Sequence, residues 1–224
     1  MRAVVIGLVF LVVAGAVAVA LRLPADVSEG AHGTWGWAWL LPPYAGLAAF
    51  AAWRLGRRGQ LRDLLHFRPG DPTLGIGVGC ALLLLAWLLG RLLLPPTSAV
   101  HGWLVRLFLL AGDTSTPAAI GGLLGLALCD ELVWRGLVQA ELDEWLGPRR
   151  GWIACALLYA AAFAATLVTL RDEVAGPNPL LVLVALGSGS CWGFVRARSG
   201  RLVPAIVSHA AFAYLATQFL ERFI

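Results

Sequence analysis

Two acids and an arginine interrupt an apolar stretch that runs from about Ala118 to Val138. They stand in the segment Cys129-Asp130-Glu131-Leu132-Val133-Trp134-Arg135-Gly136. A charge at the centre of a bilayer costs roughly 2.5–3.5 kcal/mol on insertion scales, so such residues mark either a functional site or a buried ion pair. A carboxylate held in a low-dielectric setting can take a proton from water near neutral pH, which is the task of a hydrolytic base.

Helical spacing predicts how these three side chains relate to one another. Glu131 and Arg135 stand at i and i+4, one above the other, and should neutralise each other. Asp130 lies about 100° around a regular α-helix from Glu131, so we expect it to face a different neighbour. The alternative to a catalytic origin is a buried salt-bridge cluster that fixes helix packing.

The composition places these residues in a membrane protein. The chain of 224 residues is 59% hydrophobic and 13% charged, with a mean hydropathy of +0.79. It has too little polar surface to cover a soluble globule, and its apolar runs reach membrane-spanning length. The formal net charge of +4 comes from arginines near predicted loops, which indicates contact with the lipid bilayer and argues against nucleic-acid binding.

Apolar runs punctuated by proline, glycine and charge predict an all-α polytopic bundle of seven to eight transmembrane helices, forming a single membrane domain over residues 1–224. The predicted spans are Ala3 to Leu23, Trp35 to Trp53, Thr73 to Leu94, Pro117 to Ala140, Trp152 to Leu170, Pro179 to Val195 and Leu202 to Leu220. A weaker segment, His101 to Ala111, would cover only about 16 Å of a ~30 Å core, so it is either re-entrant or an eighth span.

The distribution of arginines favours seven crossings. If His101 to Ala111 does not cross, one side of the membrane carries Arg54, Arg57, Arg58, Arg62, Arg68, Arg149, Arg150, Arg196, Arg198 and Arg201 together with Arg2. The acids Asp26, Glu29, Asp113, Asp172 and Glu173 then fall on the other side. By the positive-inside rule, the arginine-rich side and the N-terminus face the cytoplasm. Residues 1–23 also look like a signal peptide, but the long apolar run favours a retained first helix.

His209 is the second candidate for chemistry. It lies about seven residues into the last predicted span, whereas Asp130 lies about ten residues from the basic end of its own span. These counts correspond to depths of roughly 10 and 15 Å, both in the cytoplasmic half. The sequence therefore predicts one site shared by Asp130, Glu131 and His209.

The segment that contains Asp130 and the segment that ends at His209 resemble the CPBP group of intramembrane proteases. This group includes the CAAX prenyl endopeptidases and bacterial relatives. The similarity rests on Asp130-Glu131-Leu132-Val133-Trp134-Arg135-Gly136, set against a Glu-Glu-x-x-x-Arg motif, and on Pro204-Ala205-Ile206-Val207-Ser208-His209. It covers about residues 117–222, which would form the catalytic core. The resemblance implies an integral protein of a bacterial cytoplasmic membrane that hydrolyses a peptide bond of a membrane-anchored protein or peptide.

The resemblance also implies roles for the site residues. Asp130 or Glu131 would be the base for water, Arg135 the ion-pair partner that holds Glu131, and His209 an oxyanion donor. No His-Glu-x-x-His sequence or evident ligand trio is present, so we expect neither a metal nor another cofactor.

Several positions depart from the family pattern. Asp130 replaces the first glutamate, the Phe-x-x-x-His motif ends in Phe163 or, in another alignment, in Leu167, and Ala213 stands where His-x-x-x-Asn has its asparagine. These losses leave open an alternative in which the protein is an inactive relative that binds a membrane peptide or serves in self-immunity. A small transporter using the acidic pair as a proton relay is a further alternative, disfavoured because a second intramembrane acidic cluster is lacking.

Overall fold

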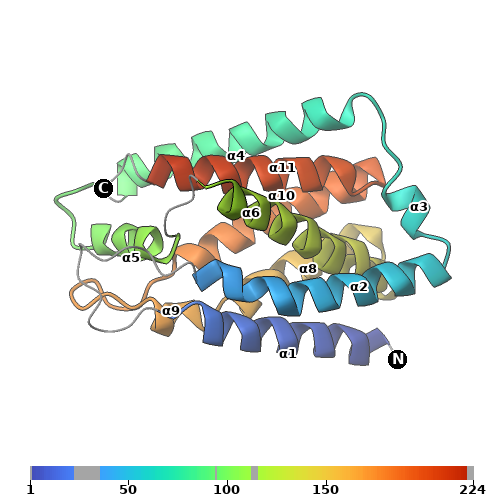
Figure 1. The fold of residues 1–224 in the computed structure, drawn as a ribbon, viewed down its shortest axis with the longest axis horizontal. Coiled ribbons are helices and arrows are strands. Elements are labelled where there is room, and N and C mark those ends of the chain that lie inside the picture. The colour runs from blue at the N-terminus through green and yellow to red at the C-terminus, as the bar shows by residue number, and fades with distance from the viewer. Residues whose placement is uncertain (1, 23–35, 94, 112–115, 221–224) are drawn as a thin grey trace.

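Long apolar helices run beside one another along the long axis of the molecule (Figure 1). The computed structural model describes residues 2–22, 36–93, 95–111 and 116–220. The helices are α1 (Arg2–Ala20), α2 (Leu41–Arg57), α3 (Leu61–Leu64), α4 (Asp71–Leu93), α5 (His101–Ala111), α6 (Pro117–Glu131), α7 (Gln139–Leu146), α8 (Pro148–Ala162), α9 (Thr166–Thr169), α10 (Leu180–Ser199) and α11 (Val203–Leu220). A 3-10 turn, Gly36–Leu40, precedes α2, and a π-helical segment, η2 (Leu132–Val138), joins α6 to α7. Within the described ranges, β pairing is limited to one bridge between Asp172 and Gly176.

The all-α membrane fold predicted from the sequence is confirmed. Five helical stretches of the described residues are long and apolar enough to cross a membrane: Arg2–Ala20, Asp71–Leu93, Pro117–Leu146, Pro148–Thr169 and Leu180–Ser199. The predicted spans Trp35 to Trp53 and Leu202 to Leu220 form α2 and α11, but neither is among the five, so the count of seven to eight stays a prediction. Leu23, Asp26, Glu29, Trp35, Leu94, Asp113 and positions 221–222 lie outside the described residues.

The fourth predicted span is longer than its apolar run. It was expected to end at Ala140, but the helical stretch continues to Leu146 and stops at Gly147, whose φ of +82° is a left-handed value. Glu141 is completely buried in this extension. It accepts a hydrogen bond from Arg54 Nε at 2.8 Å and lies 2.9 Å from an Arg58 nitrogen. Because the acid is paired, the helix can continue beyond the apolar residues that predicted it.

Ion pairs fasten the arginine-rich ends of the helices to one another. Arg2 reaches Glu144 at 2.7 Å, which joins α1 to α7. Arg201 reaches Asp71 at 2.6 Å and thereby fixes the start of α11 to the start of α4. Arg196 of α10 pairs with Asp143 of α7. These arginines thus act as cross-links between helices at one end of the bundle.

Two glycines of α4 set how closely α11 approaches it. A Cβ at Gly75 would lie 2.7 Å from Val207 Cβ and 2.8 Å from the Pro204 carbonyl oxygen. A Cβ at Gly79 would lie 3.0 Å from the Ser208 carbonyl oxygen. Small residues of this kind let helix backbones pack tightly in membranes. This close contact of Gly75 and Gly79 with α11, here called the glycine seam, positions the stretch of α11 that precedes His209.

We expect Gly75→Ala to destabilise the protein by about 1–3 kcal/mol, because the new methyl group overpacks the seam against backbone. Thermal unfolding in detergent, followed by helical circular dichroism, measures the change as a lower midpoint. Gly77→Ala on the same helix is the matched control, since a Cβ there meets nothing within 4 Å. Equal midpoints for the two variants would contradict the tight seam.

Candidate active site at the α6–η2 junction

The two acids occupy the last two positions of α6. This helix begins with Thr116 as its N-cap, whose Oγ1 accepts a hydrogen bond from Ala119 N at 3.2 Å, and with Pro117 in the first turn. Asp130 and Glu131 end the α-helical part, and the backbone then adopts π-helical geometry over Leu132–Val138. Both acids are buried, with Glu131 completely inaccessible.

The π segment changes the predicted relation between Asp130 and Arg135. Arg135 Nη1 lies 3.2 Å from Glu131 Oε1, as the i,i+4 spacing predicted, but also 3.2 Å from Asp130 Oδ2. The expectation that Asp130 would face a different neighbour was therefore wrong. A π-helical turn brings residues i and i+5 together, and π segments of this kind often occur at functional sites. One guanidinium nitrogen thus pairs with both acids.

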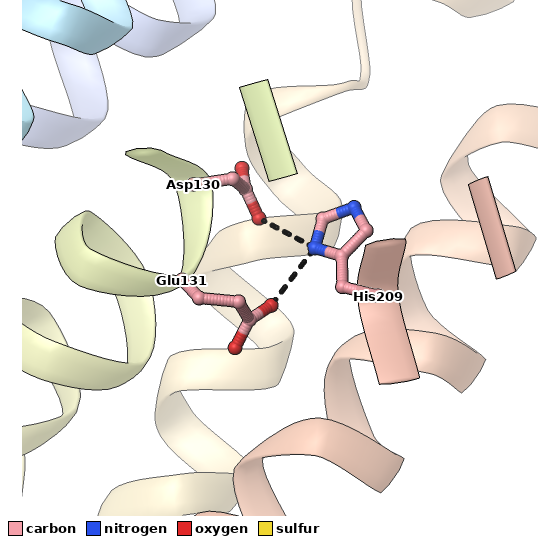
Figure 2. Close-up of side chains that lie close together, drawn as sticks. All are labelled: Asp130, Glu131 and His209. Atoms are coloured by element: carbon pink, nitrogen blue, oxygen red, sulfur yellow. Dashed lines mark hydrogen bonds and ion pairs between the residues drawn. The ribbon is translucent and has the colours of Figure 1, made fainter. Parts of the chain in front are cut away.

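His209 of α11 meets both acids from across the bundle. Its Nδ1 lies 2.9 Å from Glu131 Oε1 and 3.5 Å from Asp130 Oδ2 (Figure 2). The close-up shows the two carboxylates and the imidazole converging on one point, with the second ring nitrogen directed away. All four residues predicted as site residues, Asp130, Glu131, Arg135 and His209, are therefore brought together in the structure.

The guanidinium of Arg135 is enclosed by aromatic rings. Its Cζ lies 4.2 Å from the centre of the Tyr159 ring and 5.2 Å from that of Trp192. A Cβ at Gly189 would lie 2.8 Å from Tyr159 and 3.0 Å from Arg135 Nη2, so only glycine lets α10 approach so closely. Cation–π contact with desolvated rings stabilises an arginine that has no contact with solvent. Carboxylates on one edge and rings on its faces hold the charge in place.

Trp192 is a site residue that the sequence-based prediction missed. Its ring stacks on His209 with centroids 3.9 Å apart and planes 15° from parallel, while its Nε1 donates to Ser208 Oγ at 3.0 Å. The indole is almost completely buried. Trp192 stands three residues before Val195, the predicted end of its span, and membrane tryptophans commonly gather at span ends, so no sequence signal set it apart as a site residue.

Two of the positions that depart from the family pattern, Phe163 and Ala213, carry apolar side chains. Phe163 packs against Tyr159 with ring centroids 5.3 Å apart, so α8 contributes aromatic packing where the resemblance implies a histidine. Ala213 lies one turn beyond His209 on α11 and has no side-chain amide.

Three polar atoms of the site, Glu131 Oε2, Arg135 Nε and Arg135 Nη2, are buried without a hydrogen-bond partner among the described residues.

Asp130, Glu131 and His209 also have the residue types of a metal site. Each offers one ligand atom, and these atoms lie within 4.8 Å of one another. However, the two acid oxygens that face His209 are the same two that Arg135 Nη1 contacts at 3.2 Å. A divalent cation bound there would sit against a fixed guanidinium and would have to displace it. The residues present therefore do not fit a metal in this arrangement.

Comparison with known proteins identifies the part of the chain that carries this site. Residues 112–215 match the family model described as type II CAAX prenyl endopeptidase Rce1-like, and this range contains Asp130, Glu131, Arg135 and His209. No curated protein and no solved structure matches the chain. The resemblance to the CPBP intramembrane proteases is thereby confirmed, and the segment that builds the site is Rce1-like.

Proposed function

We propose that this protein is an intramembrane endopeptidase of the CAAX-protease type that hydrolyses a peptide bond of a membrane-associated protein. The observation that carries the proposal is the convergence of Glu131 Oε1, Asp130 Oδ2 and His209 Nδ1 inside an Rce1-like segment. A protease of this kind must activate water beside the scissile carbonyl. The acids and the imidazole are the groups available for that task.

The surroundings of the site favour a membrane-anchored substrate. His209 is the seventh residue of α11, counted from the arginine-rich end of the bundle, so the site lies within the apolar thickness and toward that end. The positive-inside rule assigns that end to the cytoplasm, and we propose a bacterial cytoplasmic membrane as the location. Charge that develops in a site without much water is stabilised strongly by fixed groups.

We further infer seven crossings, made by α1, α2, α4, α6–α7, α8–α9, α10 and α11. The arrangement in Figure 1 supports this count, because α5 is a short helix that lies only at the end of the bundle where α4 finishes. α5 has only 11 residues, or about 16 Å of helix, which is too short for a ~30 Å core.

Alkaline phosphatase fusions test the count, since the enzyme is active only outside the cytoplasm. Fusions after Ser98 and after Thr116 flank α5, and we expect both to be active. A fusion after Arg149 should be inactive because that loop faces the cytoplasm. Opposite activities for the Ser98 and Thr116 fusions would mean that α5 crosses the membrane and that the count is eight.

Substitutions in the site should strongly reduce cleavage. With purified protein in liposomes and a panel of prenylated and tail-anchored peptides, we expect Asp130→Asn, Glu131→Gln and His209→Ala each to lower kcat about 100-fold or more. His66→Ala is the control, since His66 is exposed and lies outside the site, and it should retain full activity. Cleavage that survives all three site substitutions would refute the assignment. Stable peptide binding by wild-type protein without any cleavage would favour an inactive, peptide-binding relative.

Cleavage should also be independent of divalent metals, because Arg135 already occupies the acid oxygens that a metal would need. Prolonged dialysis against EDTA or 1,10-phenanthroline is expected to leave kcat unchanged. Inactivation by both chelators, reversed by adding back one divalent cation, would show that a metal replaces Arg135 at these oxygens.

A further inference from the structure

Exposure separates the residues of the site into inner and outer groups. The side chains of Glu131 and Arg135 have no accessible surface, and that of Asp130 is 6% exposed. The His209 side chain is 14% exposed. A base must touch a water molecule that also reaches the scissile carbonyl. Among these four groups, the imidazole is the one best placed to meet a substrate that approaches from outside.

The partners of His209 decide where its ring proton lies. Nδ1 faces Glu131 Oε1 at 2.9 Å and Asp130 Oδ2 at 3.5 Å, and ionised carboxylates only accept hydrogen bonds. Nδ1 therefore carries the hydrogen and donates it to Glu131. In the neutral ring this leaves a free lone pair on Nε2, which points away from both acids in Figure 2. That tautomer is the one a general base requires.

Trp192 holds the plane of the His209 ring. The indole covers one face of the imidazole at 3.9 Å, and Phe212 packs edge-on against the indole at 6.2 Å. The hydrogen bond from Trp192 Nε1 to Ser208 Oγ ties the indole to the residue before His209. Tilting the imidazole out of its plane would break the parallel stack, while the contact of Nδ1 with Glu131 Oε1 selects the edge that faces the acid, so Trp192 acts as a positioning residue for the ring plane.

We propose that His209 Nε2 is the base that takes the proton from the attacking water, with Glu131 as its orienting carboxylate and Trp192 as its positioning residue. This inference rests on the proposed function and replaces the oxyanion-donor role expected from the family resemblance. The chain has Phe163 and Ala213 where the family resemblance implies a second histidine and an asparagine. Fewer groups are therefore left to activate water, and His209 is one of them.

The step needs no reactant other than water and the peptide. Nε2 removes one proton from water while the water oxygen bonds to the carbonyl carbon. The imidazolium, stabilised by Glu131, then gives that proton to the leaving nitrogen as the carbon–nitrogen bond breaks. The products are a carboxyl end and an amine end, and the ring returns to its starting tautomer. Glu131 and Arg135 keep their charges throughout.

Two isosteric variants separate a base from an oxyanion donor. His209→Gln keeps an N–H donor near the position of Nε2, and His209→Asn keeps one near Nδ1, but neither can accept a proton. In single-turnover cleavage by the full-length protein in liposomes, we expect both to match His209→Ala, at least about 100-fold below wild type. If His209→Gln stays within about tenfold of wild type, the imidazole is a donor and the inference is overturned, whereas the proposed function stands.

The positioning role of Trp192 has its own readout. Trp192→Phe keeps an aromatic face for stacking and should retain most activity. Trp192→Leu should lower kcat about tenfold with KM unchanged, because the base is misoriented while substrate binding is intact. A fall in activity that appears only in KM, or equally in both variants, would contradict this role.

Nitrogen-15 NMR of histidine-labelled protein tests the tautomer without any substrate. The signal of His209 is the one missing in His209→Ala, and at a pH where the ring is neutral we expect the hydrogen on Nδ1. A hydrogen on Nε2 would overturn the inference even if the protein is an active protease. If wild-type protein cleaves no peptide, the proposed function fails and this inference fails with it.

Discussion

The structure depends on the burial of one guanidinium. Arg135 has no solvent contact, and its charge is balanced by two carboxylates that share its Nη1. Removing one partner of a buried ion pair typically costs about 3–5 kcal/mol, because the charge that remains is uncompensated. The helices that surround Arg135 supply side chains that compensate its buried charge. α6 supplies the acids, α8 and α10 supply the rings on its faces, and α11 brings the imidazole that contacts the same acids.

The pairing with Arg135 also holds the two acids in place beside His209. The Asp130 and Glu131 carboxylates both pair with Arg135 and both face His209, so the imidazole meets acids that are already held in one geometry. Groups fixed in advance do not have to reorganise as charge develops, which is the main advantage of a preorganised site. In this arrangement the two oxygens that a cation would bind are already engaged by Arg135.

Contacts outside the site help to hold the site residues in position. Arginines at the arginine-rich end of the bundle pair with Glu141 of α7 and with Asp71 of α4, and the second pair fixes the start of α11. The glycine seam between α4 and α11 fixes the following turns. Because His209 comes shortly after these contacts, its depth relative to Glu131 is set by packing outside the site. α1 and α2 lie outside the Rce1-like match, yet they join the core through Glu141.

Much of the protein was determined by its sequence alone. Apolar runs predicted the helices, including His101–Ala111 with its observed bounds, because the bilayer rewards uninterrupted apolar length. Charges inside one run, and a histidine at matching depth, predicted which residues would share a site. Only the tertiary structure decided that Asp130 joins the Arg135 pair through a π turn and that Trp192 stacks on His209. It also decided which edge of His209 faces Glu131. A membrane helix that is apolar on all sides carries little information about its own rotation, so contacts across helices emerge only when neighbouring side chains pack.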